Sequence, residues 1–184
     1  IWFVGIFNAV NLVDGLDGLA GGFMVILCIS AGFLSHGLFS QINLLLTLLI
    51  IVFLLFNQRP AKIFMGDAGS LFLGFFVAVL PLLYYDLGFS SSTLNVTPFV
   101  ILVSFLVADT TRVFFTRILA KKSPMSADTI HFHHLILQNS GSYMVTLFAI
   151  FSVVTISGVF AVLSSHFNFT KIDMLWHLLF LFLF

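Results

Sequence analysis

The stretch "NLVDGLDGLAGGFMVILCISAGFLS", residues 11–35, joins a polar turn directly to an apolar segment. The turn carries two aspartates three residues apart, Asp14 and Asp17, and each is followed by a glycine. The segment 19–35 contains no charged residue and, as a helix, approaches the roughly 20 residues needed to cross a bilayer. The stretch therefore predicts a membrane helix with a carboxylate-bearing turn at one end.

The rest of the chain has the same apolar character. Of its 184 residues, 60% are hydrophobic and 8% are charged, whereas a typical soluble domain has about 25% charged residues. Further apolar segments, of which the last two are partial, lie at 42–56, 71–85, 98–116, 143–164, 1–7 and 174–184. We therefore expect an all-α fold, a polytopic transmembrane helical bundle.

Charge and cysteine content exclude several classes of protein. The net charge is zero, so we expect no nucleic-acid partner. All seven acidic residues are aspartates. The single cysteine, Cys28, excludes an internal disulfide and a cysteine-based metal cage.

The basic residues predict the orientation in the membrane. Only Lys171 lies on one set of loops, whereas the other set carries Arg59, Lys62, Arg112, Arg117, Lys121 and Lys122. Because cytoplasmic loops are enriched in Lys and Arg, the loops predicted to face the cytoplasm are 8–18, 57–70 and 117–142. The loops predicted to face outward are 36–41, 86–97 and 165–173. We expect a multi-pass protein of the inner (cytoplasmic) membrane.

The first cytoplasmic loop suits a hard metal ion. Glycines after Asp14 and Asp17 allow close approach of a ligand, and clustered carboxylate oxygens are the ligands of Mg²⁺ or Mn²⁺. A polar turn that caps the next helix is an equally good interpretation of this loop alone.

The second loop, "NQRPAKIFMGDAGS" at 57–70, favours a phosphate site. Asp67 stands among small residues at the start of an apolar segment, where backbone N–H groups at a helix N-terminus bind anions. Arg59 and Lys62 lie nearby in the sequence. A metal-binding carboxylate, glycines and cations are the usual parts of such a site.

The third loop contains "HFHH", with His131, His133 and His134. Zinc is one interpretation, but no zinc motif such as HExxH is present, and contacts to phosphate or sugar fit the neighbouring cations better. Asp109 and Arg112, three residues apart, are predicted to form an ordinary ion pair near the membrane surface.

In this order, the motifs "NAVNLVDGLDGLAGG", "NQRPAKIFMGDAGS" and "SPMSADTIHFHH" resemble those of the polyprenyl-phosphate N-acetylhexosamine-1-phosphate transferases, glycosyltransferase family 4. The H-x-H-H spacing resembles the undecaprenyl-phosphate N-acetylglucosamine-1-phosphate transferase branch. The phospho-N-acetylmuramoyl-pentapeptide transferases usually carry three consecutive histidines there.

The resemblance implies a Mg²⁺-dependent phosphoglycosyl transferase, with Mn²⁺ as an alternative ion. Such an enzyme transfers N-acetylhexosamine-1-phosphate from a UDP-sugar to undecaprenyl phosphate and releases UMP. This reaction starts lipid-linked cell-envelope glycans such as the O-antigen of lipopolysaccharide. The expected partners are UDP-N-acetylhexosamine, undecaprenyl phosphate and the lipid bilayer, and a homodimer is compatible with the sequence.

The resemblance also implies roles for single residues. The catalytic and metal-binding residues are expected to be Asp14, Asp17 and Asp67. The residues expected to bind substrate are Asn8, Asn11, Asn57, His131, His133, His134, Arg117 and Lys121.

One departure from the family pattern concerns completeness. The family carries two adjacent aspartates on an earlier cytoplasmic loop, and this chain contains no such pair. The chain also begins and ends within apolar runs. We therefore expect residues 1–184 to be the C-terminal portion of a longer protein, a single transmembrane transferase domain without its N-terminal helices.

The sequence is compatible with four other functions. A phospho-N-acetylmuramoyl-pentapeptide transferase-like enzyme differs mainly at the histidines. A transporter places ionisable residues near the bilayer midplane, whereas the polar cluster here is expected at one face. A CDP-alcohol phosphotransferase requires an arginine that residues 14–22 lack. The fourth function is that of a non-catalytic membrane scaffold.

Overall fold

A computed structural model describes residues 2–86, 97–121, 123 and 130–167, and every element in these residues is a helix. The helices are α1 (Trp2–Val13), α2 (Leu19–Leu34), α3 (Leu38–Asn57), α4 (Gly66–Asp86), α5 (Thr97–Leu102), α6 (Ser104–Leu119), α7 (Phe132–Ser140) and α8 (Tyr143–Phe167). The all-α prediction is confirmed for this part of the chain.

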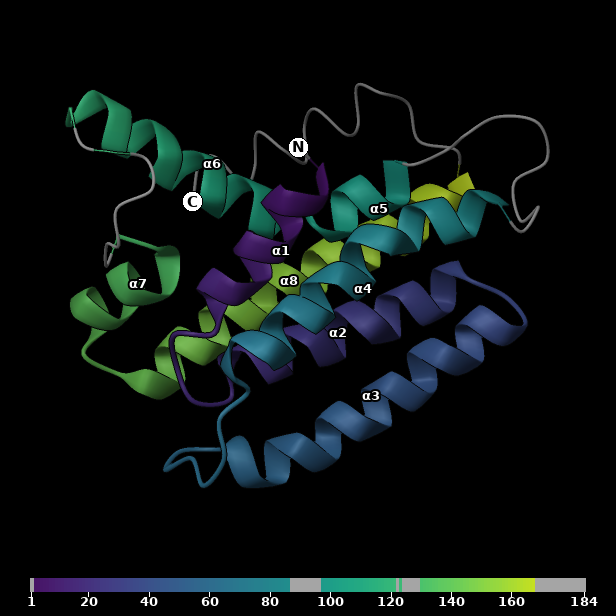
Figure 1. The fold of residues 1–184 in the computed structure, drawn as a ribbon, viewed down its shortest axis with the longest axis horizontal. Coiled ribbons are helices and arrows are strands. Elements are labelled where there is room, and N and C mark those ends of the chain that lie inside the picture. Colours follow the sequence, from purple (N-terminus) through teal and green to yellow (C-terminus); the bar gives the residue numbers. More distant parts are fainter. Residues whose placement is uncertain (1, 87–96, 122, 124–129, 168–184) are drawn as a thin grey trace.

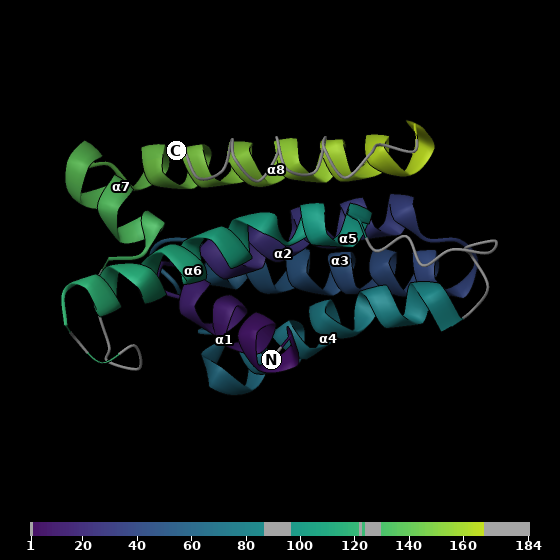
Figure 2. The ribbon, with the colours of Figure 1, turned by 90° about the horizontal axis from the view of Figure 1, so that it is seen from above.

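Helix α2 is the centre of the bundle. It packs against α3 on one side and α8 on the other, while α1 pairs with α4 and α5 lies along α8. Figures 1 and 2 show the long helices running side by side, with the short helix α7 at one end. The turns that carry the sequence motifs gather at that same end (Figure 1).

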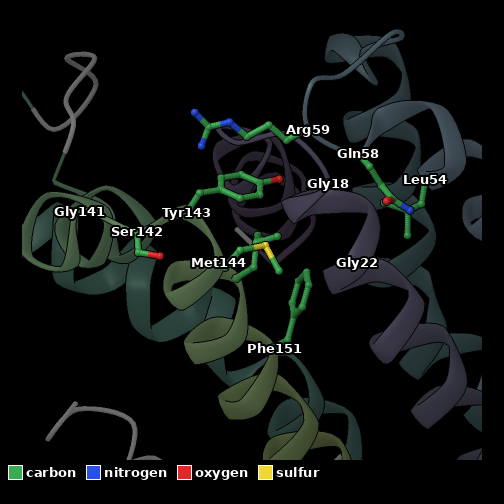
Figure 3. A pocket seen from close by; sticks show the side chains of 11 residues that line it. Gly18, Gly22, Leu54, Gln58, Arg59, Gly141, Ser142, Tyr143, Met144 and Phe151 are labelled. Atoms are coloured by element: carbon green, nitrogen blue, oxygen red, sulfur yellow. The ribbon is translucent and has the colours of Figure 1, made fainter.

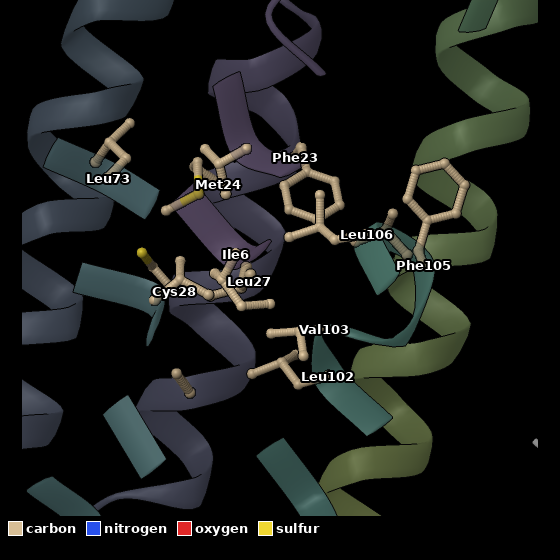
Figure 4. Close-up of a cluster of buried hydrophobic side chains, with 14 of the residues drawn as sticks. Ile6, Phe23, Met24, Leu27, Cys28, Leu73, Leu102, Val103, Phe105 and Leu106 are labelled. Atoms are coloured by element: carbon tan, nitrogen blue, oxygen red, sulfur yellow. The ribbon is translucent and has the colours of Figure 1, made fainter. Parts of the chain in front are cut away.

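The core forms where α2 meets the α5–α6 region. Phe23, Met24 and Leu27 of α2 are at most 1% exposed, as are Leu102 and Leu106. Figure 4 shows these side chains facing one another between the helices. Close van der Waals packing of these side chains holds the short helices in place.

Glycines allow the helices to approach closely. A Cβ atom at Gly74 of α4 would lie 2.8 Å from the Cα atom of Phe7 in α1, and one at Gly22 of α2 would collide with the ring of Phe151 in α8. Small residues at such crossings bring helix backbones together, as is common in membrane helices.

Two of the described helices are long and apolar enough to cross a membrane, Leu38–Asn57 and Tyr143–His166. The outer face of α3 is apolar and exposed: Leu44 is 60% and Leu55 is 65% exposed. The apolar helices Trp2–Val13, Leu19–Leu34 and Gly66–Leu82 are shorter. The number of membrane passes and their orientation remain predictions.

The prediction of a loop over residues 8–18 was wrong for residues 8–13, which continue helix α1. The side chain of Asn8 donates a 2.9 Å hydrogen bond to the carbonyl of Val4 one turn earlier, so this polar residue is compatible with the helix. The loop 57–70 is also shorter than predicted, because α4 begins at Gly66 and contains Asp67 in its first turn.

The predicted segment 98–116 is two helices, because Val103 interrupts the helix between α5 and α6. The predicted loop 117–142 contains the additional helix α7. The partial segment 174–184 and most of the loops 86–97 and 165–173 lie outside the described residues.

Candidate active site

The first two motifs are joined by the buried side chain of Asn57, at the end of α3. The Gly18 N–H donates to Asn57 Oδ1 at 2.9 Å, and Asn57 Nδ2 donates to the carbonyl of Ile63 at 2.8 Å. Gly18 has a φ of 71°, a conformation that glycine adopts without strain. Asn57 therefore fixes the Asp-Gly turn to the following loop, and both ends of its amide are engaged within the protein.

Asp17 faces this same loop. Its Oδ2 accepts a 3.1 Å hydrogen bond from the Ala61 N–H. The Tyr143 hydroxyl, at the start of α8, donates to the Asp17 backbone carbonyl. The structure thus ties Asp17 to the second loop and to α8, and no sequence signal pointed to Tyr143.

Asp14 and Asp67 form a different arrangement. Asn11, in the last turn of α1, donates from Nδ2 to Asp67 Oδ1 at 3.2 Å, and the Asp14 N–H donates to the Asn11 carbonyl at 3.1 Å. Asn11 therefore connects the two acidic residues. Asp67 is exposed and Asp14 is half-buried. Neither carboxylate forms an ion pair with a described basic side chain.

The electrostatics of this Asp14–Asp67 pair are unfavourable in the absence of a cation. Partial burial raises the pKa of Asp14, and the nearby Asp67 carboxylate raises that pKa further. A second carboxylate that raises the pKa of Asp14 leaves a local excess of negative charge, which attracts a metal cation. The chemistry of this donor set, hard anionic oxygens, fits Mg²⁺ or Mn²⁺.

The three predicted metal-binding aspartates do not form one cluster here. Among the described residues, no group of three or more His, Cys, Asp or Glu side chains is placed to hold a metal ion. Two carboxylates are sufficient for Mg²⁺, which usually retains waters and binds substrate phosphates as its other ligands. Asp14 and Asp67 fit that description, whereas the Asp17 carboxylate bonds to Ala61.

The histidine motif is held by a clamp of Asp109 and Arg112 on α6. Asp109 Oδ2 pairs with His131 Nδ1 at 2.8 Å, and Asp109 Oδ1 accepts from the Phe132 N–H at 3.1 Å and from Arg112 at 2.9 Å. Arg112 also donates to the Ile130 carbonyl, and its guanidinium lies 4.3 Å from the centre of the Phe132 ring.

The clamp corrects the prediction of an ordinary surface ion pair. The side chain of Asp109 is 5% exposed, and together the two residues contact three consecutive positions at the start of α7, 130–132. The i, i+3 spacing in "DTTR" predicted that Asp109 and Arg112 would meet. Nothing in the sequence indicated that they would bind the histidine motif, because that contact depends on tertiary packing.

His133 connects the histidine motif to the Asp-Gly turn. Its ring is stacked on that of His131, with centroids 6.0 Å apart and planes 11° from parallel, and lies 4.1 Å from the ring of His134. A Cβ atom at Gly15 would lie 2.5 Å from His133 Nε2. The glycine between Asp14 and Asp17 therefore allows His133 to pack against the turn.

The pKa is lowered for two of the three histidine rings. Burial lowers the pKa of His133 to about 4, with further lowering by His134 and His131. Burial and His131 also lower the pKa of His134. The Nε2 atoms of His131 and His133 are buried and have no hydrogen-bond partner in the described part of the chain. Unpaired buried polar atoms are uncommon and are typical of functional sites.

The remaining predicted site residues are Asn8, Arg117 and Lys121. Asn8 is exposed on α1 and bonds within its own helix. Arg117 is buried in the last turn of α6, and Lys121 is exposed two residues beyond its end, with a φ of 55°. Their roles in substrate binding remain predictions.

These features define a class of protein: its described residues form only helices, two of them of membrane length, with a site of carboxylates and imidazoles at one end of the bundle. Comparison with known proteins is more specific. The glycosyl transferase family 4 model matches residues 1–85. Together with the relatives described next, this match shows that the chain belongs to the family, as the three motifs predicted.

Two similar relatives cover most of the chain. A probable undecaprenyl-phosphate N-acetylglucosaminyl 1-phosphate transferase of Bacillus subtilis (strain 168) is 37% identical over 166 residues, 88% of this chain and 46% of the relative. An undecaprenyl-phosphate alpha-N-acetylglucosaminyl 1-phosphate transferase of Thermotoga maritima is 34% identical over 149 residues, 80% of this chain and 45% of the relative.

A third relative matches a shorter region. A phospho-N-acetylmuramoyl-pentapeptide-transferase of Streptococcus agalactiae is 45% identical over 84 residues, 43% of this chain and 25% of the relative. The chain thus spans less than half the length of the curated relatives described here.

Proposed function

We propose that the complete protein transfers N-acetylglucosamine-1-phosphate from UDP-N-acetylglucosamine to undecaprenyl phosphate and releases UMP. The names of the two relatives that cover most of the chain support undecaprenyl phosphate as the acceptor and N-acetylglucosamine-1-phosphate as the transferred group. The observation that carries the proposal is the contact of Gly15 with His133, which brings the acidic turn and the histidine motif into one site. A site that binds a sugar diphosphate needs one group that holds a cation beside the diphosphate and another that binds the sugar.

In this proposal, Asp14 and Asp67 hold a divalent cation, and Asn11 orients Asp67 through its 3.2 Å hydrogen bond. When bound, the cation would neutralise negative charge on the donor diphosphate. Asp17 and Asn57 position the turn, because their polar groups bond to the loop that follows α3.

The histidines bind the sugar or its phosphates. A neutral imidazole has one N–H donor and one acceptor nitrogen, which suits a sugar that carries hydroxyl and acetamido groups. His133 is neutral near pH 7 because burial lowers its pKa to about 4. The Asp109–Arg112 clamp keeps the start of α7 in place, so that the ring of His133 remains beside the Asp-Gly turn.

The acceptor needs little help from a base. The second pKa of a phosphate monoester is about 6, so undecaprenyl phosphate is mostly dianionic near pH 7. The main barrier is the approach of two anions, and groups that neutralise or orient them supply most of the catalysis. We place the site at the cytoplasmic face of the inner membrane, in agreement with the distribution of Lys and Arg.

The test is an assay of the full-length protein in membranes with three radiolabelled donors: UDP-N-acetylglucosamine, UDP-N-acetylgalactosamine and UDP-N-acetylmuramoyl-pentapeptide. We expect labelled lipid product and UMP with the first donor, together with a requirement for Mg²⁺ or Mn²⁺. Product only from the pentapeptide donor would establish the second candidate, which the 45% identity to the streptococcal relative favours. No product from any donor would contradict the proposal.

A further inference from the structure

A groove lies between the C-terminal end of α3 and the start of α8. Its volume is about 680 Å³, and its walls are formed by Leu54, Arg59, Tyr143, Met144, Leu147 and Phe151. Figure 3 shows Arg59 and Tyr143 at one side of the opening and Phe151 further along α8. None of the site aspartates or histidines lines this α3–α8 groove.

The groove is amphiphilic. Its deeper part is apolar, and Gly18 and Gly22 contribute to it without side chains that would fill the space. At the mouth, the guanidinium of Arg59 lies 4.9 Å from the centre of the Tyr143 ring. Arg59 is exposed and forms no ion pair with a described acidic side chain. One end therefore offers a cation and the other an apolar surface.

The position of the groove along the helices also bears on its ligand. Arg59 follows the end of α3 by two residues, and Tyr143 is the first residue of α8. These are the two described helices long enough to cross a membrane. Arg and Tyr at the ends of such helices lie at the boundary between lipid chains and headgroups. The mouth of the groove thus lies at headgroup level and its apolar part faces the chain region.

We infer that the α3–α8 groove binds one anionic phospholipid, whose phosphate pairs with Arg59 and whose acyl chain lies over Leu54, Leu147 and Phe151. The charge at the mouth favours an anionic headgroup over a zwitterionic one. The volume is in the range of single-ligand sites, roughly 300–1,000 Å³. This inference is independent of the proposed transferase activity.

The test is native mass spectrometry of the full-length protein, purified with phosphatidylglycerol and phosphatidylcholine in equal amounts. We expect preferential retention of phosphatidylglycerol, and a loss of this preference by about fivefold in the Arg59→Gln variant. Lys62→Gln is the matched control, because Lys62 is exposed on the same loop but does not line the groove. The control should keep the preference.

A second variant tests the apolar part. Leu147→Trp fills the groove and should reduce retention of both lipids, while thermal unfolding confirms that the variant is folded. Equal retention of phosphatidylglycerol by the wild-type protein and Arg59→Gln would overturn the inference. Cysteines placed at positions 59 and 144 give a further test. If they cross-link to a second copy or to another segment of the same protein, the groove is covered by protein and the inference is overturned.

Discussion

The acidic pair Asp14–Asp67 and the clamp around Asp109 use the same functional group in opposite ways. Asp109 is buried, and its carboxylate contacts an arginine, an imidazole and a backbone N–H. Asp67 is exposed, its only described side-chain partner is the amide of Asn11, and it raises the pKa of Asp14. One carboxylate is neutralised by the protein and the other is not.

The difference separates positioning from binding. A buried carboxylate with all of its partners supplied by the protein stabilises the fold around it. Two adjacent carboxylates without a cationic partner cost stability, and a protein retains them where a ligand supplies the missing charge. Variants of the two regions should therefore affect different measurements.

The largest effect is expected for Asp109→Ala. This change leaves Arg112, His131 Nδ1 and the Phe132 N–H without their partner, and breaking a buried ion pair typically costs about 3–5 kcal/mol. Hydrogen exchange should show loss of protection across α7. Thr116→Ala, on the exposed side of the same helix, is the control and should leave α7 protected. Unchanged protection of α7 in Asp109→Ala would show that the clamp does not hold the helix.

Asp67→Asn should lower activity without lowering the stability of the fold, in contrast to Asp109→Ala. The amide preserves the size of the side chain but removes an anionic ligand, and we expect a loss in turnover of about a hundredfold, or ~3 kcal/mol in activation free energy. Steady-state kinetics of the full-length protein over a range of Mg²⁺ concentrations measures it. Near-normal turnover at limiting Mg²⁺ would assign the metal to another residue.

Gly15→Ala tests the contact between the two regions. The added methyl group would meet His133 Nε2, so the His133 ring or the turn must shift, at a cost of about 1–3 kcal/mol. We expect a raised KM for the UDP-sugar. Gly5→Ala is the control, because a Cβ atom there has no neighbour within 4 Å. An unchanged KM in Gly15→Ala would mean that the contact does not matter for donor binding.

The smallest effect is expected for Asp14→Asn in metal-free protein. Because the folded-state pKa of Asp14 is raised, the ionised carboxylate destabilises the fold above that pKa. The variant should be more stable near pH 7 by less than about 1 kcal/mol, since solvent screens this half-exposed group. The advantage should disappear as the pH falls through the pKa of Asp14. Thermal unfolding at several pH values is the measurement, and a lower stability of the variant near pH 7 would contradict the repulsion between Asp14 and Asp67.

The sequence predicted those parts of the molecule that depend on local pattern. The apolar runs predicted α2 and α3 to within four residues at their starts, because apolar composition alone selects a helix in a membrane. The break at Val103 and the helix α7 were not predicted. Both depend on packing against other helices, which a single run of residues does not specify.

The same limit applies to the site. The Asp-Gly and H-x-H-H patterns identified the residues that meet at one end of the bundle, and the resemblance predicted the family that the comparisons show. The patterns did not distinguish Asp17, which bonds to Ala61, from Asp14, which lies beside Asp67. They also did not indicate that Asp109 would hold His131, because residues 22 positions apart meet only in the fold.

The most direct test of this account is Mn²⁺ binding by the full-length protein, followed by electron paramagnetic resonance. The account predicts that Asp14→Asn/Asp67→Asn lowers Mn²⁺ affinity by at least about tenfold, in line with the loss of two hard anionic ligands. Asp17→Asn and Asp109→Asn should retain the wild-type affinity, because their carboxylates bond to Ala61 and to the histidine motif. Equal Mn²⁺ affinity in the wild-type protein and the Asp14/Asp67 variant would contradict the assignment of this pair as the cation site.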